Sequence, residues 1–224
     1  MPQAKVGVVV FPGSNCDHDA YYVCKDILKI DTQFLWHKDS SVGDRNIIIL
    51  PGGFSYGDYL RCGAVSGFSS IMTDVIRFAR NGGVVIGICN GFQILCECGL
   101  LPGALLRNVN LKFICDDVSI KVENNKTIFT GNYAIKEDIV IPVAHGEGNY
   151  YCDEDTLSDL ISRNEIVFTY NNNTNGSLYN IAGIQNKERN VLGMMPHPER
   201  ASDEKLGLCG GKRLFESVIQ SVTL

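Results

Sequence analysis

The sequence lacks both a long apolar run and a cluster of basic residues. Its longest apolar stretch, around Val84–Ile88, is far short of the roughly 20 residues that a membrane-spanning helix needs. No group of Lys and Arg is longer than the pair Lys212–Arg213, and the formal net charge is −5. Residues 1–11 have too short an apolar core for a signal peptide and no cleavage site. We therefore expect a cytoplasmic protein that binds neither nucleic acid nor a membrane surface.

Cysteine is abundant, but its nine residues are odd in number and irregularly spaced. A disulfide framework normally uses an even number of cysteines. Cys96 and Cys98 lie two residues apart, yet no second cysteine pair and no histidine pair follows at zinc-site spacing. We therefore expect free thiols in a reducing compartment and no metal ligands in this chain.

The first hundred residues alternate short apolar runs with helical patterns, which is typical of a parallel sheet wound by crossover helices. The predicted strands cover 5–11, 32–37, 46–51 and 84–89, and the predicted helices cover 18–30, 68–80 and 91–98. No linker interrupts the chain, so residues 1–224 are expected to form one domain.

After residue 103 the pattern changes to shorter alternating segments separated by Asn, Asp and Gly. These segments lie at 117–123, 126–131, 138–148, 165–170 and 180–200, with helical patterns at 155–163 and 211–222. The alternation favours an antiparallel sheet laid onto the same domain. The predicted fold class is α/β, with a central, mostly parallel sheet flanked by helices and an added antiparallel sheet.

Residues 87–95, "GICNGFQIL", have the form of a nucleophile elbow, with small residues two positions before and after the nucleophile. Gly87 and Gly91 permit a sharp turn from strand to helix around Cys89. A thiolate there would be stabilised by the helix dipole, and free backbone N–H groups could bind an oxyanion. The alternative interpretation is a buried structural cysteine in a glycine-lined turn.

A second segment, "PHPER" at 196–200, holds a histidine and a carboxylate two residues apart. Flanking prolines favour an extended backbone, in which His197 and Glu199 face the same way. Glu199 could then orient His197 toward a thiol, as in a catalytic triad. Alone, such a histidine is more often an ordinary surface residue, but with the elbow it predicts a Cys89–His197–Glu199 triad.

The loop "PGGFSYGD" at 51–58 ends the strand before the elbow strand, so it should lie beside Cys89. We expect the backbone N–H groups of Gly53 and Asn90 to form an oxyanion hole. The other interpretations are a plain glycine-rich turn or a weak phosphate cradle, although the loop lacks the Gly-Lys-Ser/Thr ending of a P-loop.

Together "GICNGFQIL", "PHPER" and "PGGFSYGDYLR" resemble the class I (triad) glutamine amidotransferases. The resemblance covers essentially the whole chain and implies a flavodoxin-like sheet. Asn90, Arg200 and "AHGEG" at 144–148 make it more similar to the stand-alone glutaminase subunits of phosphoribosylformylglycinamidine synthases.

The resemblance implies that Cys89 attacks the side-chain amide of L-glutamine and that His197 protonates the departing ammonia. It also implies that Glu199 orients the histidine, and that Gln93 and His145 border the glutamine site. Ammonia would pass to a large synthetase subunit, where ATP and Mg²⁺ drive formation of formylglycinamidine ribonucleotide, with a small third subunit bridging the complex. No cofactor is implied on this chain.

Two other functions stay open from the sequence: a cysteine peptidase or glyoxalase-like enzyme with the same elbow, and a catalytically silent docking subunit. Cys62 stands where we would expect a smaller residue such as alanine. Tyr56, Asp58 and Arg61 could couple the site to the partner, or Arg61 could simply form a loop-stabilising ion pair.

Overall fold

The computed structural model describes residues 3–223, which are built around one nine-stranded sheet in the order β2-β1-β3-β4-β11-β10-β9-β6-β7. The first five strands in this order are parallel, and the remaining strands pair antiparallel. The strands of this sheet are β1 (Lys5–Val10), β2 (Asp31–Trp36), β3 (Ile47–Leu50), β4 (Val84–Ile88), β6 (Ile114–Val122), β7 (Asp138–His145), β9 (Ile166–Tyr170), β10 (Ile181–Gln185) and β11 (Val191–Met194).

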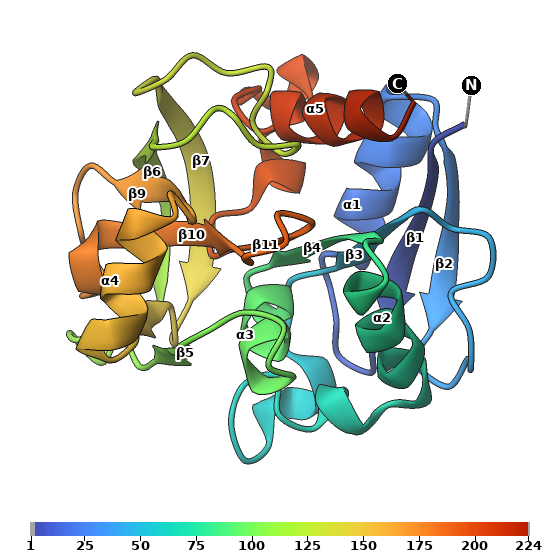
Figure 1. Cartoon of the computed structure of the whole chain (residues 1–224), viewed down its shortest axis with the longest axis horizontal. Helices are drawn as coiled ribbons and strands as arrows, with labels where there is room; N and C mark the ends of the chain where they lie inside the picture. The colour runs from blue at the N-terminus through green and yellow to red at the C-terminus, as the bar shows by residue number, and fades with distance from the viewer. Residues whose placement is uncertain (1–2, 224) are drawn as a thin grey trace.

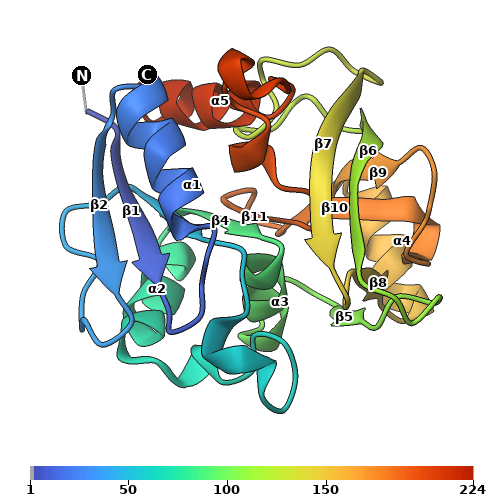
Figure 2. The same cartoon turned by 180° about the vertical axis from the view of Figure 1, so that it is seen from behind.

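Helices cover both faces of the parallel half of the sheet. Figures 1 and 2 show α1 and α5 on one face, α2 and α3 on the other, and α4 beside the antiparallel half. The helices are α1 (Asp17–Tyr22), α2 (Ser70–Arg80), α3 (Asn90–Glu97), α4 (Glu154–Ser162) and α5 (Lys212–Thr223). The predicted α/β class with a flavodoxin-like, mostly parallel centre is therefore confirmed.

The central strands are apolar along their whole length because helices cover both of their faces. Every residue of β3, β4 and β11 is buried. Parallel strands in this position read as continuous hydrophobic runs. Helix α2, in contrast, buries one face and exposes the other, as its amphipathic sequence requires.

The antiparallel strands differ from the sequence-based expectation in how they join the domain. They extend the edge of the main sheet, and only β5 (Ala104–Leu106) and β8 (Asn149–Tyr151) form a separate two-stranded sheet. Within predicted segment 180–200, β10 is antiparallel to its neighbours but β11 is parallel to β4. Backbone pairing of β11 with β4 thus brings the end of the chain back beside the elbow.

The predicted strand at 126–131 is wrong, because these residues form turns. Thr127 and Thr130 bond each other through their hydroxyls, and Thr130 also donates to the Asn124 carbonyl. Such local side-chain bonds compete with strand pairing. The first helix is likewise shorter than predicted, since α1 passes into a π-helical turn over Val23–Ile27.

Across residues 3–223, the structure has no helix that is both long and apolar enough to span a membrane.

Gly91 lies where helix α3 approaches strand β3 most closely. A Cβ atom on residue 91 would lie 2.0 Å from the carbonyl oxygen of Leu50, which belongs to the fixed backbone of the sheet. We expect Gly91→Ala to lower the free energy of unfolding by about 3 kcal/mol, the upper end of the usual cost of overpacking. Urea unfolding measures this loss. The control is Gly131→Ala, where the nearest atom would be 3.8 Å away, and equal losses in the two variants would contradict the packing argument.

Candidate active site

The candidate site lies where the carboxyl ends of β3, β4 and β11 meet. These strands are parallel neighbours, with Leu50 paired to Gly87 and Met194 paired to Ile88. The residues that follow each strand therefore emerge side by side at one edge of the sheet, where ligands of parallel sheets bind. The loop from Pro51, the elbow at Cys89 and the His197 segment are brought together in this way.

Cys89 has the strained backbone that a nucleophile elbow requires. Its φ is 50° and its ψ is −104°, a conformation that costs a non-glycine residue about 1–3 kcal/mol. The Cys89 N–H donates to the Met194 carbonyl at 2.7 Å, and α3 begins at the next residue. A Cβ at Gly87 would lie 2.6 Å from the Gly91 carbonyl oxygen, so both predicted glycines are needed for the turn.

His197 and Glu199 form the buried pair that the sequence predicts, but the backbone between them is not extended as expected: Pro198–Arg200 form a 3-10 turn. The His197 Nδ1 lies 2.6 Å from Glu199 Oε1, and both side chains are almost completely buried. The His197 N–H donates to the Pro142 carbonyl of β7 at 2.8 Å, which fixes the segment against the antiparallel half. The His197 Nε2 has no hydrogen-bond partner within residues 3–223, and Cys89 is near enough to interact with the ring.

The charge state of His197 depends on two opposing effects. Burial by itself lowers the pKa of the imidazole, but the Glu199 carboxylate and the Cys89 sulfur together raise the pKa well above its usual value. The geometry therefore favours an imidazolium next to the sulfur at neutral pH. Such an arrangement can hold a proton for a leaving group.

The two predicted oxyanion-hole residues are Asn90, which directly follows Cys89, and Gly53, which lies in the loop after β3. Gly53 has φ 136°, which only glycine adopts readily. Its backbone forms an isolated antiparallel bridge with Ser14. Within residues 3–223, neither the Gly53 nor the Asn90 backbone N–H donates to another group. Both amides therefore remain available for a ligand.

The side chains of Asn90 and Gln93 tie the elbow helix to the two loops around it. Asn90 Oδ1 accepts from the Ser55 hydroxyl at 2.5 Å, and Asn90 Nδ2 donates to Gln93 Oε1 at 2.9 Å. Gln93 Nε2 in turn donates to the Glu147 carbonyl at 2.8 Å. Gln93 thus links the elbow to the segment that carries "AHGEG", and its role in glutamine binding stays a prediction.

His145, at the end of β7, lies near His197 and is held by a residue that the sequence analysis missed. Asn108 is fully buried, and its Oδ1 lies 3.1 Å from His145 Nδ1 and accepts from the Gly148 N–H. Asn108 Nδ2 also donates to the His145 carbonyl. No local pattern around Asn108 marks it, because its partners are distant in the sequence.

Burial of His145 predicts a specific loss of stability in acid. Burial first, and then the nearby His197 charge, lowers the pKa of His145 from 6.5 to about 4. Between these values the unfolded chain binds a proton that the folded chain does not, so stability falls as the pH falls. We expect His145→Asn to flatten this dependence by up to about 3 kcal/mol between pH 6.5 and pH 4. Chemical unfolding at several pH values tests this, and parallel curves for the two proteins would contradict it.

The polar loop after Gly53 contacts the rest of the fold through several side chains. Tyr56 Oη lies 2.7 Å from His37 Nδ1, and Arg61 pairs with Glu97 at 2.6 Å. Burial raises the pKa of the half-buried Asp58, which lies beside Cys62. Arg61 therefore makes the ion pair that one interpretation predicted, and its coupling to a partner stays a prediction.

Cys16 and Arg200 adjoin the His197–Glu199 pair, and sequence reasoning gave Cys16 no role. Cys16 follows β1 and is almost completely buried. The Arg200 guanidinium donates to its sulfur at 3.1 Å and to Asp19 at 3.1 Å. The position of β1 next to β3 in the sheet, which local sequence does not reveal, brings this thiol to the site.

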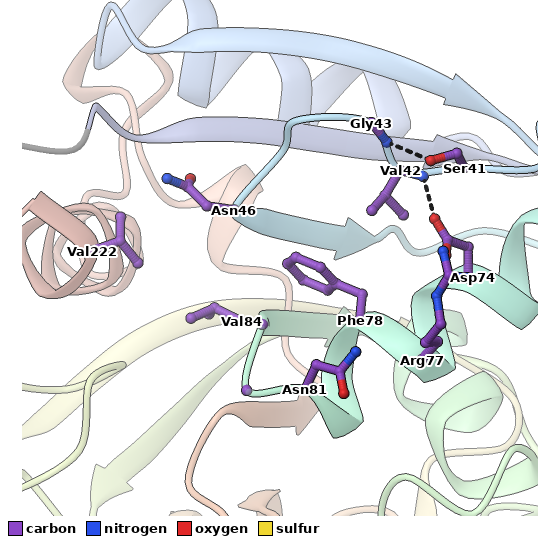
Figure 3. A pocket seen from close by; sticks show the side chains of 12 residues that line it. Ser41, Val42, Gly43, Asn46, Asp74, Arg77, Phe78, Asn81, Val84 and Val222 are labelled. Atoms are coloured by element: carbon purple, nitrogen blue, oxygen red, sulfur yellow. Dashed lines mark hydrogen bonds and ion pairs between the residues drawn. The ribbon is translucent and has the colours of Figure 1, made fainter.

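A pocket of about 520 Å³ at the opposite end of the sheet does not belong to this site. Figure 3 shows Asn46 and Val84, at the amino ends of β3 and β4, with Phe78 pointing into the space between them. Asp74 accepts from the Val42 N–H at 2.8 Å and pairs with Arg77. Because its charged groups satisfy one another at the amino ends of the strands, we assign it no catalytic role.

Comparison with known proteins agrees with this geometry. A sequence model of the CobB/CobQ-like glutamine amidotransferase domain matches residues 3–206. The chain therefore belongs to this family of glutamine amidotransferases.

Solved structures give the same result at two levels of similarity. A chain in the structure of PurLQS from Thermotoga maritima is 45% identical, with a TM-score of 0.91, and the match covers 99% of this chain and 100% of that chain. A candidate GMP synthase protein from Thermoplasma acidophilum is 15% identical, with a TM-score of 0.64 and coverage of 100% and 96%. A glutamine amidotransferase from Thermotoga maritima is 13% identical, with a TM-score of 0.63 and coverage of 99% of both chains. The last two similarities concern the fold alone.

Proposed function

We propose that this chain is the glutaminase subunit of a phosphoribosylformylglycinamidine synthase, which acts in purine (IMP) biosynthesis. The observation that carries the proposal is the 45% identity, over nearly the full length of both chains, to a chain of PurLQS. We propose that the protein is located in the cytoplasm, a reducing compartment in which its free cysteines would stay reduced.

In the proposed reaction the Cys89 sulfur attacks the side-chain amide carbon of L-glutamine. The carbonyl oxygen becomes an oxyanion, which the free N–H groups of Gly53 and Asn90 would stabilise. His197 then gives its proton to the amide nitrogen, the carbon–nitrogen bond breaks, and ammonia leaves. A γ-glutamyl thioester on Cys89 remains.

The second half of the reaction returns the enzyme to its starting state. His197 takes a proton from a water molecule, which attacks the thioester carbon and releases glutamate with the carbon–sulfur bond broken. Glu199 acts through His197 in both steps, because it holds Nδ1 and leaves Nε2 to face the reacting atoms. The strained elbow and the fixed histidine segment prepare these groups before glutamine binds.

We further propose that the ammonia is used on a separate large synthetase subunit, where ATP and Mg²⁺ bind, with a small third subunit completing the complex. The solved relative supports this, since PurLQS denotes an assembly of three kinds of subunit. On this proposal the ligase chemistry belongs to the partner, and this chain supplies only ammonia.

Reconstitution tests the proposed function. The chain is combined with its synthetase and small subunits, and ammonia release and formylglycinamidine ribonucleotide formation are measured with glutamine as the nitrogen source. We expect both reactions to require this chain. Peptidase activity without ammonia release from glutamine would contradict the proposal, and so would glutamine-dependent synthesis that needs no catalytic cysteine on this chain.

A further inference from the structure

Three side chains that commonly bind metals lie together beside the proposed triad, on the face of His197 that Glu199 holds. They are Cys16, His197 and Glu199, and their ligand atoms all lie within 4.8 Å of one another. All three residues are buried, with exposed fractions of 2%, 2% and 5%. Within residues 3–223, no other group of three or more His, Cys, Asp or Glu side chains has this spacing.

One carboxylate oxygen in this cluster has no partner, although it is buried. His197 Nδ1 engages Glu199 Oε1, while Glu199 Oε2 has no hydrogen-bond partner in the described part of the chain. Buried carboxylate oxygens are nearly always satisfied, so an unpartnered one indicates a position where a ligand can bind. A cation would supply that partner.

A surface pocket beside β6 and β7 reaches one residue of the cluster, His197. This pocket of about 290 Å³ is lined by His197 and Arg200, and its lining also includes the exposed residues Cys115, Asp116 and Asp117. The two carboxylates that line this pocket would attract a divalent cation. Dehydration of the ion on the way to a buried thiol favours borderline-soft ions over Mg²⁺.

We propose that Cys16, His197 and Glu199 bind one Zn²⁺ ion, and that this ion inhibits the glutaminase reaction. Sulfur, imidazole nitrogen and carboxylate oxygen are the ligands that Zn²⁺ takes, and three protein ligands leave a fourth position for water. A tetrahedral zinc centre needs ligand atoms about 3.5 Å apart, so the three side chains have to move together slightly. The Cys16 thiol loses its proton to solvent when the metal binds.

Inhibition follows from the atoms that the metal occupies. Zn²⁺ on His197 Nδ1 and Glu199 would replace the hydrogen bond that orients the imidazole. The metal would also hold the ring as a neutral ligand with its proton on Nε2, so the ring could no longer alternate between imidazolium and imidazole. Because the ion lies on the side of the ring away from Cys89, the glutamine site stays open. Zinc should therefore lower kcat and leave KM for glutamine unchanged; only this kinetic part rests on the proposed function.

Arg200 opposes metal binding, since its guanidinium donates to the Cys16 sulfur and carries a positive charge. Its side chain is about one-third exposed and also pairs with Asp19, so it can move outward. Removing this charge in Arg200→Gln should tighten zinc binding about tenfold, if a single neighbouring charge is worth about 1.4 kcal/mol at the site.

Direct binding of Zn²⁺ and Co²⁺ to the metal-free full-length chain tests the proposal. Zinc affinity is measured by competition with a chromophoric chelator, and bound Co²⁺ is detected by its thiolate-to-metal absorption. We expect one equivalent to bind to the wild type, to Cys89→Ala and to the pocket control Cys115→Ser. Cys16→Ser should lose the thiolate band and at least about tenfold in affinity.

Each of the other outcomes overturns the proposal. The first is a wild type that binds no single equivalent of metal. The second is a Cys89→Ala variant that no longer binds the metal, and the third is a Cys16→Ser variant that binds it unchanged. The fourth is inhibition that is competitive with glutamine. If Cys16→Ser does not fold, Glu199→Gln takes its place, because the amide removes the anionic ligand. This variant should lower zinc affinity at least about tenfold. An unchanged zinc affinity in Glu199→Gln would count against the site. Because binding is measured without glutamine, a failure of the proposed function does not affect this result.

Discussion

Replacing Cys89 by alanine should abolish glutamine-dependent ammonia release, with a fall of at least about 10⁴-fold in kcat. This is the loss expected when the nucleophile of a coupled catalytic unit is removed. The methyl group keeps the buried position at the start of α3, so the chain should still fold. Ammonia release from glutamine, measured with the partner subunits present, gives the effect. Cys209→Ala is a control on a half-buried thiol outside the site.

The same variant separates the two half-reactions of the complex. Synthesis driven by added ammonium salt should be retained in Cys89→Ala, because the ATP-dependent step lies on the synthetase subunit in our proposal. If ammonium-driven synthesis were also lost in a well-assembled complex, the assignment of the chemistry to two subunits would be wrong. If glutamine-driven synthesis were unchanged, this chain would be a silent docking subunit.

Glu199→Gln should lower kcat about 10³-fold to 10⁴-fold and change KM for glutamine by no more than about twofold. A neutral amide next to Nδ1 no longer stabilises the imidazolium and can hold the ring in the wrong tautomer, a change that costs about 10⁴-fold in serine proteases. Glutamine itself does not contact Glu199 in the proposed mechanism, so its binding is spared. Steady-state kinetics over a range of glutamine concentrations measures both constants.

A matched control for Glu199→Gln is the same change at the exposed Glu204, five residues further on, which should leave both constants unchanged. The pH dependence gives an additional readout. Because Glu199 raises the pKa of His197, the variant should lose imidazolium at a lower pH than the wild type does. A rise in KM with kcat unchanged would instead mean that Glu199 binds substrate.

Much of the site could be predicted because its determinants are local. Gly87 and Gly91 are required by the turn itself, so their spacing around Cys89 indicated the elbow directly. The two-residue spacing of His197 and Glu199 similarly indicated that they pair. The extended backbone expected there is wrong, because Pro198–Arg200 form a 3-10 turn. The continuous apolar runs of the central strands also indicated a sheet covered on both faces.

The features that the sequence did not reveal depend on strand pairing over long distances. Strand β11 was expected to be antiparallel, because an alternating segment does not specify the direction of its neighbour. Cys16 reaches His197 only because β1 lies next to β3 in the sheet. Asn108 holds His145 through bonds that span 37 residues. Segment 126–131 was mistaken for a strand because its threonines close turns through their own hydroxyls.

The most direct test of the account is covalent labelling by a glutamine analogue with an electrophilic ketone in place of the side-chain amide. Intact-protein mass spectrometry and peptide mapping would identify the labelled thiol among the nine cysteines. We predict a single label on Cys89, slowed by glutamine and absent in Cys89→Ala. Labelling of another thiol that glutamine slows equally, or labelling of Cys89 that glutamine leaves unaffected, would contradict the assignment of Cys89 as the nucleophile of a glutaminase.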